Sequence, residues 1–236
     1  MSKTFNALAL TLILGLTATS SMAWQGKLMD NQVPPDLAHL VNVGNTDAIN
    51  ELGMRFMQGN GVGENSGKAI ELFRKAAVMG NQYAQLNLGI LYLNGYQRLK
   101  KDEAEAIKWL SKAAKQDNVD AQIQLANLFD SDRTKADNVE KALSWYKKAA
   151  ELGSHLGMYN VGVYFNKGIG VKQNYAEAIK WYEQSAELGN LDALFNLGAL
   201  YANGQGVTKN PQKAKEIFSE GCAQGDKQAC TELKKI

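Results

Sequence analysis

The amino-acid sequence predicts an all-α fold, an α-solenoid in which antiparallel helix pairs stack along one axis. The first observation is an internal repeat of 36 or 37 residues, because periods of this size mark repeat architectures. The second is that each repeat contains two apolar stripes at helical spacing. The third is glycine just past most second stripes, where a left-handed residue ends a helix. The repeat is marked by small residues at Ala48, Ala84, Ala121, Gly157, Ala193 and Ala229.

Residues 1–23 are expected to be a secretory signal peptide. Lys3 is their only charged residue, an apolar run follows at 7–16, and Ser21-Met22-Ala23 supplies the small residues that precede a cleavage site. The apolar run is too short to span a bilayer, and an uncleaved N-terminal anchor is the alternative. We therefore expect a periplasmic or secreted protein after cleavage following Ala23.

Residues 24–43 precede the first repeat and are expected to form an N-terminal cap segment. Pro34-Pro35 interrupts the chain, and residues 36–41 are expected to form a short helix. The end of a solenoid must cover the apolar face of its outermost unit. We therefore expect this segment to pack on the first repeat.

Each repeat is predicted to contain two helices. Residues 157–165 illustrate the first helix: small residues stand at offsets 0 and 5, an aliphatic at 4 and an aromatic at 8. These offsets share one helical face, and the small residues allow a neighbouring helix to approach closely. The second stripe begins with alanine and continues with a large pair such as Trp145-Tyr146. Its tryptophans, Trp109, Trp145 and Trp181, are predicted to pack in the core.

The loops between the two helices differ among the repeats. Three repeats have Gly-x-Gly-Val, at 59–62, 168–171 and 204–207, which predicts a loop with positive φ angles. A phosphate-binding loop is the alternative, although no strand precedes these sequences. Repeats 2 and 3 depart from the pattern at 95–99 and 130–138. We interpret the departures as drift, and a binding role for these loops is the alternative.

Composition excludes several classes of function. Lys and Arg number 26 against 24 Asp and Glu, and a net charge of +2 argues against a basic nucleic-acid surface or a polybasic membrane patch. Two His and two Cys leave little for a metal site. We expect no metal, no cofactor and no catalytic residue. Ser144 and Lys147 formally match the S-x-x-K motif of serine enzymes, but S-D-N and K-T-G are absent.

The repeat pattern resembles a known family. The sequence A-x3-L-G-x2-Y-x2-G-x-G-V-x6-A-x2-W-Y-x2-A-A-x2-G is similar to the Sel1-like repeat, a relative of the tetratricopeptide repeat. Residues 157–189 match it at nearly every position by residue class, and five units plus a terminal half-unit cover residues 44–236. The resemblance implies a right-handed superhelix whose first helices line a concave surface. It also implies a non-catalytic module that binds other proteins.

Cys222 and Cys230 are predicted to form a disulfide. They lie at the end of one predicted helix and the start of the next, where a tight turn brings such positions together, and export favours oxidation. Free buried cysteines and a redox-active pair are the alternatives. The Cys-x7-Cys spacing also resembles the cysteine-rich Sel1-like proteins of bacteria. That resemblance implies a link to β-lactams, so a β-lactam-interacting hydrolase is the alternative function.

The partner-binding surface is expected in the concave groove. If the geometry resembles tetratricopeptide units, the residues flanking the Leu-Gly pair of each first helix point into the groove. Large apolar side chains in such a groove are the usual anchors of an interface. Packing of these residues against neighbouring helices is the alternative. The predicted partner-binding residues are Leu86, Ile90, Ile123, Asn127, Tyr159, Val163 and Phe195.

The sequence therefore predicts an exported protein–protein interaction module. Two roles are open: a scaffold or regulator of envelope proteins, and an immunity-type inhibitor of a toxic effector. We expect the partner to be a protein, with no nucleic acid and no membrane insertion. The sequence names neither the partner nor the oligomeric state.

Overall fold

The computed structural model describes residues 33–236, which form twelve helices. The predicted signal peptide and residues 24–32 of the predicted cap segment lie outside the described residues. The prediction of an all-α solenoid is confirmed. The helices are α2 (Pro35–Asn42), α3 (Thr46–Gln58), α4 (Ser66–Val78), α5 (Gln82–Asn94), α6 (Glu103–Ala114), α7 (Val119–Asp130), α8 (Ala136–Glu151), α9 (His155–Lys167), α10 (Tyr175–Glu187), α11 (Leu191–Asn203), α12 (Pro211–Ala223) and α13 (Lys227–Leu233).

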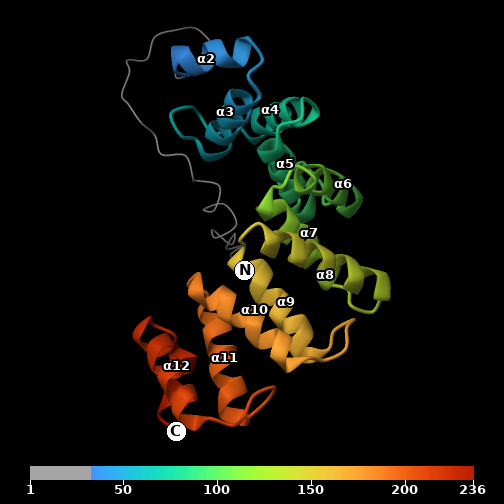
Figure 1. Ribbon diagram of the computed structural model, residues 1–236. Helices are drawn as coiled ribbons and strands as arrows, with labels where there is room; N and C mark the ends of the chain where they lie inside the picture. Colours follow the sequence, from blue (N-terminus) through green and yellow to red (C-terminus); the bar gives the residue numbers. More distant parts are fainter. Residues whose placement is uncertain (1–32) are drawn as a thin grey trace.

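The helix pairs follow one another along a curved row from α2 to α12 (Figure 1). First helices of neighbouring repeats touch in three of four cases, since α3 contacts α5, α5 contacts α7, and α9 contacts α11, whereas α7 and α9 do not contact to this extent. Within residues 33–236, the second helices α4, α6, α8, α10 and α12 do not contact one another to this extent. The side on which helices approach most closely is the inside of a curved stack. The concave face is therefore made by α3, α5, α7, α9 and α11.

Side-chain caps explain where the helices begin. At the start of α5, the Asn81 side chain accepts a hydrogen bond from the Ala84 amide, which satisfies a donor that the helix itself leaves free. The same bond begins α3, α7, α9 and α11, and the second helices α4, α6, α10 and α12 also have one. Among the helices of the five repeats the exception is α8, which follows Lys135 and has no side-chain cap.

The turn residues have the predicted conformations. Gly168 and Gly170 of the fourth repeat have φ angles of 67° and 64°, as the Gly-x-Gly loops require. Asp117 stands where other repeats have glycine after the second helix, and its φ of 60° is left-handed too. Asp tolerates this conformation better than most residues, so the α6–α7 turn keeps the geometry of the others.

Close packing of the two helices in a repeat depends on glycine. A Cβ atom at Gly162 of α9 would lie 2.7 Å from the Tyr182 ring of α10, closer than real Cβ atoms come. The same crowding occurs at Gly53, Gly89 and Gly198. The small residue predicted to allow close approach therefore does so against the large side chain of the second helix.

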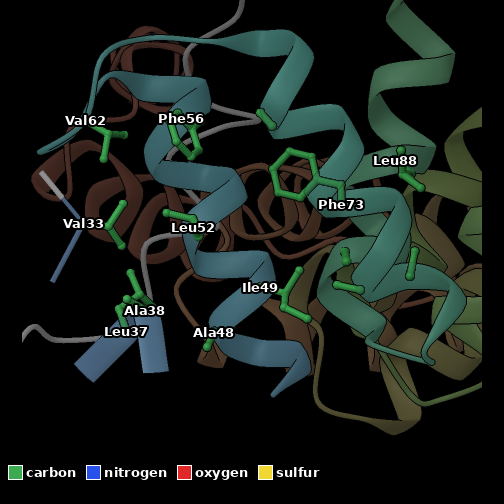
Figure 2. Packing of buried hydrophobic residues seen from close by; sticks show 14 of the residues in the cluster. Val33, Leu37, Ala38, Ala48, Ile49, Leu52, Phe56, Val62, Phe73 and Leu88 are labelled. Carbon is green, nitrogen blue, oxygen red and sulfur yellow. The ribbon is translucent and has the colours of Figure 1, made fainter. Parts of the chain in front are cut away.

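The buried apolar residues fall into five clusters along the solenoid. The first cluster contains Leu52 and Phe56 of α3, with Val33, Leu37 and Ala38 packed against them (Figure 2). The described part of the cap segment thus covers the apolar face of the first repeat. None of the helices in residues 33–236 has the length and apolarity needed to cross a membrane.

At the other end, Cys222 of α12 and Cys230 of α13 form a disulfide, with their Cα atoms 4.6 Å apart. The predicted pairing is confirmed. The bond ties the last, seven-residue helix to the repeat before it.

All three tryptophans pack on the core as predicted, but to different depths. Trp109 is buried, whereas Trp145 and Trp181 are half-buried against the cluster around Tyr146. The fully buried member of each later pair is the following tyrosine, Tyr146 or Tyr182. Trp145 instead lies at the surface beneath the Lys148 ammonium, which is 4.2 Å from its ring centroid.

Candidate partner-binding surface

Two of the seven predicted binding residues, Leu86 and Ile123, are buried. Leu86 is 2% exposed and packs with Leu110 and Leu125, and Ile123 is 8% exposed and belongs to the cluster around Tyr146. The expectation that these two side chains face solvent is therefore wrong. Leu86 is enclosed because α5 touches both α3 and α7, and Ile123 is buried because it packs with apolar residues of α8 and α9.

The equivalent residues of the next two repeats, Tyr159 and Phe195, are half-buried. Each ring packs on the large aromatic residue of its own second helix: Tyr159 lies 6.0 Å from Tyr182 and Phe195 lies 5.6 Å from Phe218, between ring centroids. Burial raises the pKa of Tyr159, and the Asp192 charge adds to the rise. Both rings are thus held from behind while part of each remains accessible to a partner.

Phe195 also lines the hollow between α11 and α13, which has a volume of about 330 Å³. Lys227, Gln228, Thr231 and Glu232 of α13 complete its lining. The hollow is open to solvent and combines one aromatic ring with charged and polar groups. It can accept a side chain of a partner beside the Phe195 ring.

The remaining predicted residues follow the Leu-Gly pair. Ile90 and Val163 are half-buried and pack on the clusters beneath them. Asn127 is exposed, and its Oδ1 accepts a hydrogen bond of 2.7 Å from the Tyr146 hydroxyl. The accessible part of the predicted row therefore runs from Asn127 toward Phe195.

Beside Asn127 lies a polar group that sequence reasoning missed, which we call the Asp130 cluster: Asn127, Asp130, Arg133, Tyr146 and Tyr164. The Arg133 guanidinium donates two hydrogen bonds to the Asp130 carboxylate, of 2.7 and 2.6 Å. The Tyr164 hydroxyl donates to the same carboxylate. The rings of Tyr146 and Tyr164 meet edge to face, with centroids 5.9 Å apart.

Opposing effects set the charge of Asp130. Burial by itself would raise its pKa, but the hydrogen bonds from Arg133 and Tyr164 outweigh burial and lower the pKa. Burial raises the pKa of Tyr146 and of Tyr164, and the Asp130 charge raises both further. At neutral pH the cluster therefore holds one carboxylate, one guanidinium and two neutral phenols. Its strong donors already point at Asp130, so the polar groups of the cluster satisfy one another and join α7, the loop at 130–136, α8 and α9.

A comparison among the repeats supplies the signal that could have found this cluster. Tyr146 and Tyr182 carry hydroxyls at a position where the other repeats have Phe73, Leu110 and Phe218. Each hydroxyl meets a polar residue of its first helix, because Asn166 donates to the Tyr182 hydroxyl at 3.3 Å as Tyr146 donates to Asn127. In repeats 3 and 4, a tyrosine hydroxyl on the second helix is thus accompanied by a polar partner on the first helix.

A polar residue stands before each Leu-Gly pair. Two of these residues, Asn87 and Asn160, form hydrogen bonds within the solenoid. Asn87 is 5% exposed and donates a 3.0 Å hydrogen bond to Asn50, which links α5 to α3. Asn160 donates to the Leu156 carbonyl one turn earlier. These side chains are therefore occupied within the solenoid.

The structure also shows where the residues considered for alternative functions lie. Ser144 is exposed on α8, and the Lys147 ammonium lies over the Phe165 ring, 5.8 Å from its centroid. Asp132, in the irregular loop of repeat 3, pairs with Lys135 at 2.9 Å. Within residues 33–236 no three His, Cys, Asp or Glu side chains gather closely enough to hold a metal ion.

Five consecutive segments match the family model of the Sel1 repeat: residues 46–81, 82–118, 119–154, 155–190 and 191–226. The chain belongs to the Sel1 repeat family. Each matched segment contains one first helix and the second helix packed on it, and Sel1 repeats form protein-interaction modules.

Two solved structures share this fold. The chain is 31% identical to c5321, a protective antigen of uropathogenic Escherichia coli strains, with a TM-score of 0.78; the match covers 84% of this chain and 42% of that one. It is 29% identical to a Sel1 repeat protein from Oxalobacter formigenes, with a TM-score of 0.71 and coverage of 84% and 87%. Among curated proteins, 59 residues are 44% identical to an F-box protein of Arabidopsis thaliana, which is 25% of this chain and 16% of that protein. The chain thus spans less than half of c5321 and about a sixth of the F-box protein.

Proposed function

We propose that this protein is an exported scaffold or regulator that holds a segment of an envelope protein on its concave face. Membership of the Sel1 repeat family supports the protein-binding part of the proposal. The leader-like sequence of residues 1–23 supports export. The observation that carries the choice of surface is the pair of half-buried rings, Tyr159 and Phe195, at equivalent positions of adjacent repeats.

The two rings have the properties of interface anchors. Aromatic residues that are partly packed and partly accessible dominate binding energies at protein interfaces. Tyr182 and Phe218 support them from behind, so little side-chain entropy is lost when a partner binds. Val163 lies on the same helix as Tyr159, and the hollow at Phe195 offers room for a partner side chain. Together they favour an apolar segment of a partner on α9 and α11.

The test compares equivalent positions of different repeats. We expect Tyr159→Ala and Phe195→Ala each to weaken capture of an envelope protein about thirtyfold while the melting temperature changes little. Leu86→Ala is the matched control, because Leu86 occupies the equivalent position but is buried. It should lower the free energy of unfolding by about 2–5 kcal/mol.

Capture is measured with the immobilised protein and an envelope extract, and the partners are identified by mass spectrometry. Loss of the same partner from both aromatic variants supports the proposal. If Tyr159→Ala and Phe195→Ala melt as early as Leu86→Ala, the rings are core residues and the proposal is wrong. A captured partner whose toxic activity falls on binding would assign the immunity-type role to the same face.

A further inference from the structure

Exposed apolar side chains are concentrated on one edge of the solenoid. Nine large apolar side chains are exposed in residues 33–236, and eight of them lie in or beside the turns that lead from one helix pair to the next. We call the row of these turns the turn edge. Its first patch contains Leu40, Val43, Val78, Met79 and Tyr83. Its second patch contains Leu152, Leu156 and Leu188.

Neighbouring turns of this edge are in contact. Asn81 of the α4–α5 turn donates a 2.6 Å hydrogen bond to Asp47 at the start of α3, and the Met79 side chain reaches to within 3.6 Å of the Cβ position at Gly44. In the second patch, the side chains of Asn190 and His155 are 3.2 Å apart. The exposed residues of each patch therefore belong to one continuous surface.

The turn edge is also acidic. It has seven Asp and Glu against two Lys, whereas the loops of the opposite edge have eight Lys and Arg against four Asp and Glu. In these numbers the turn edge comprises residues 43–47, 78–83, 115–120, 151–156, 187–192 and 223–228. The opposite edge comprises residues 58–65, 94–102, 130–136, 167–174 and 203–210. In the described chain the opposite edge has no exposed large apolar side chain. Apolar patches of this kind on an otherwise polar surface mark interaction sites.

We propose that the turn edge binds a cationic amphipathic α-helix of a protein partner. Lysine and arginine side chains of such a helix complement the carboxylates, and its apolar face covers the two patches. A second copy of this chain fits less well, because two turn edges would bring carboxylates together and the opposite edge lacks apolar residues. An anionic lipid surface would be repelled by the same carboxylates.

The spacing of the repeats favours a helical partner over an extended one. First helices in contact have axes about 8–10 Å apart, so the turns that lead into α3, α5 and α7, and those that lead into α9 and α11, follow one another at about that distance. Seven residues of an α-helix rise about 10 Å, so every seventh residue would meet a new turn with the same face. An extended chain covers that distance in about three residues, which point alternately to opposite faces.

The α6–α7 turn between the two patches predicts where the partner carries charge. Gln116, Asp117 and Asp120 stand there in place of exposed apolar residues. Asp117 and Asp120 are exposed, and in the described part of the chain no cation pairs with the Asp120 carboxylate. A lysine or arginine of the partner would pair with it. The partner helix is therefore expected to be apolar at both ends of its contact and cationic between them.

The probe is a synthetic lysine–leucine peptide of about 20 residues, long enough for about three repeats, with leucine on one helical face. Binding to the purified full-length exported protein is followed by fluorescence anisotropy. We expect Leu152→Ser with Leu188→Ser to weaken binding at least about tenfold, and Asp120→Asn to weaken it about threefold and reduce its salt dependence. Ile236→Ser is the matched control, because Ile236 is exposed to a similar extent but lies off the edge. It should bind as the unchanged protein does.

Three results would overturn the proposal. One is equal binding of a peptide with the same composition in scrambled order, and another is equal binding by the double variant. The third is a dimer of the free protein that Leu152→Ser with Leu188→Ser dissociates, which would assign the edge to a second copy. Neither Tyr159 nor Phe195 belongs to the two apolar patches, so Tyr159→Ala and Phe195→Ala should weaken peptide binding far less than Leu152→Ser with Leu188→Ser does. The failure of one proposal is therefore distinguishable from the failure of the other.

Discussion

A single buried oxygen, the Oε1 of Gln122, has no hydrogen-bond partner in the described chain. Its Nε2 donates to the Ala114 carbonyl, as the equivalent Gln85 does to Ala77 one repeat earlier. The difference is that Gln85 also accepts a 2.8 Å hydrogen bond from Gln116, whereas Leu152 stands at the position equivalent to Gln116. An unsatisfied buried acceptor is unfavourable, so this site is under-stabilised.

We therefore expect Leu152→Gln to stabilise the protein by about 1 kcal/mol, because the new amide can donate to Gln122 as Gln116 does to Gln85. Urea unfolding measures the change. Leu188→Gln is the control: the glutamine position of its repeat holds Met158, which offers no amide acceptor. A similar gain from both variants would mean that the removal of an exposed leucine, and not the Gln122 oxygen, is responsible.

The Asp130 cluster makes stability depend on pH. The pKa of Asp130 is lowered in the folded chain, so its contribution is present above the unfolded value of about 3.9 and is lost as pH falls through the lower folded value. At neutral pH, Asp130→Asn should reduce the free energy of unfolding by about 1–3 kcal/mol, since the hydrogen bonds that Arg133 and Tyr164 donate to a charged group are weakened. The difference from the unchanged protein should shrink below about pH 4 in urea titrations. A difference that stays constant down to pH 2 would contradict this account.

At the scale of the helix, the last element depends on the Cys222–Cys230 bond. In the chain-entropy model, closing this short loop stabilises the folded protein by about 2–3 kcal/mol. Cys222→Ser with Cys230→Ser removes that contribution. Solenoid stability is close to a sum over units and their interfaces, so the loss should be local. Hydrogen exchange should show α12 and α13 losing protection first. Equal loss in α3 and α4 is the contrary outcome.

Sequence periodicity located the helices because each element's apolar stripe is encoded within its own repeat. The burial of Leu86 and Ile123 was not predictable in this way, since it depends on how closely α5 approaches the helices of neighbouring repeats. Tyr146 was assigned to the core correctly, but its hydroxyl partner Asn127 lies on another helix. The spacing of apolar residues along the chain predicts a helix, whereas exposure of a side chain in the groove depends on the distances between helices.

At the scale of the whole molecule, export remains a prediction. Residues 1–23 carry the leader pattern and lie outside the described residues. We expect the intact mass of the protein recovered from the envelope fraction to lack these residues, with Trp24 at the new N-terminus. A cytoplasmic pool that retains Met1 would reject cleavage and would place the binding surfaces in a reducing compartment, where the disulfide would not persist.

The division of the buried residues into five clusters affects how the gene can gain or lose repeats by recombination. Each cluster joins elements close in the chain, so adding or deleting one 36-residue unit disturbs only the interfaces beside that unit and leaves the others as they were. Unequal recombination between the similar coding segments of two repeats would deliver such a change in one step. The length of the groove is therefore open to variation among descendants of this gene, while the terminal units, with α2 at one end and the disulfide at the other, are the parts that recombination must keep.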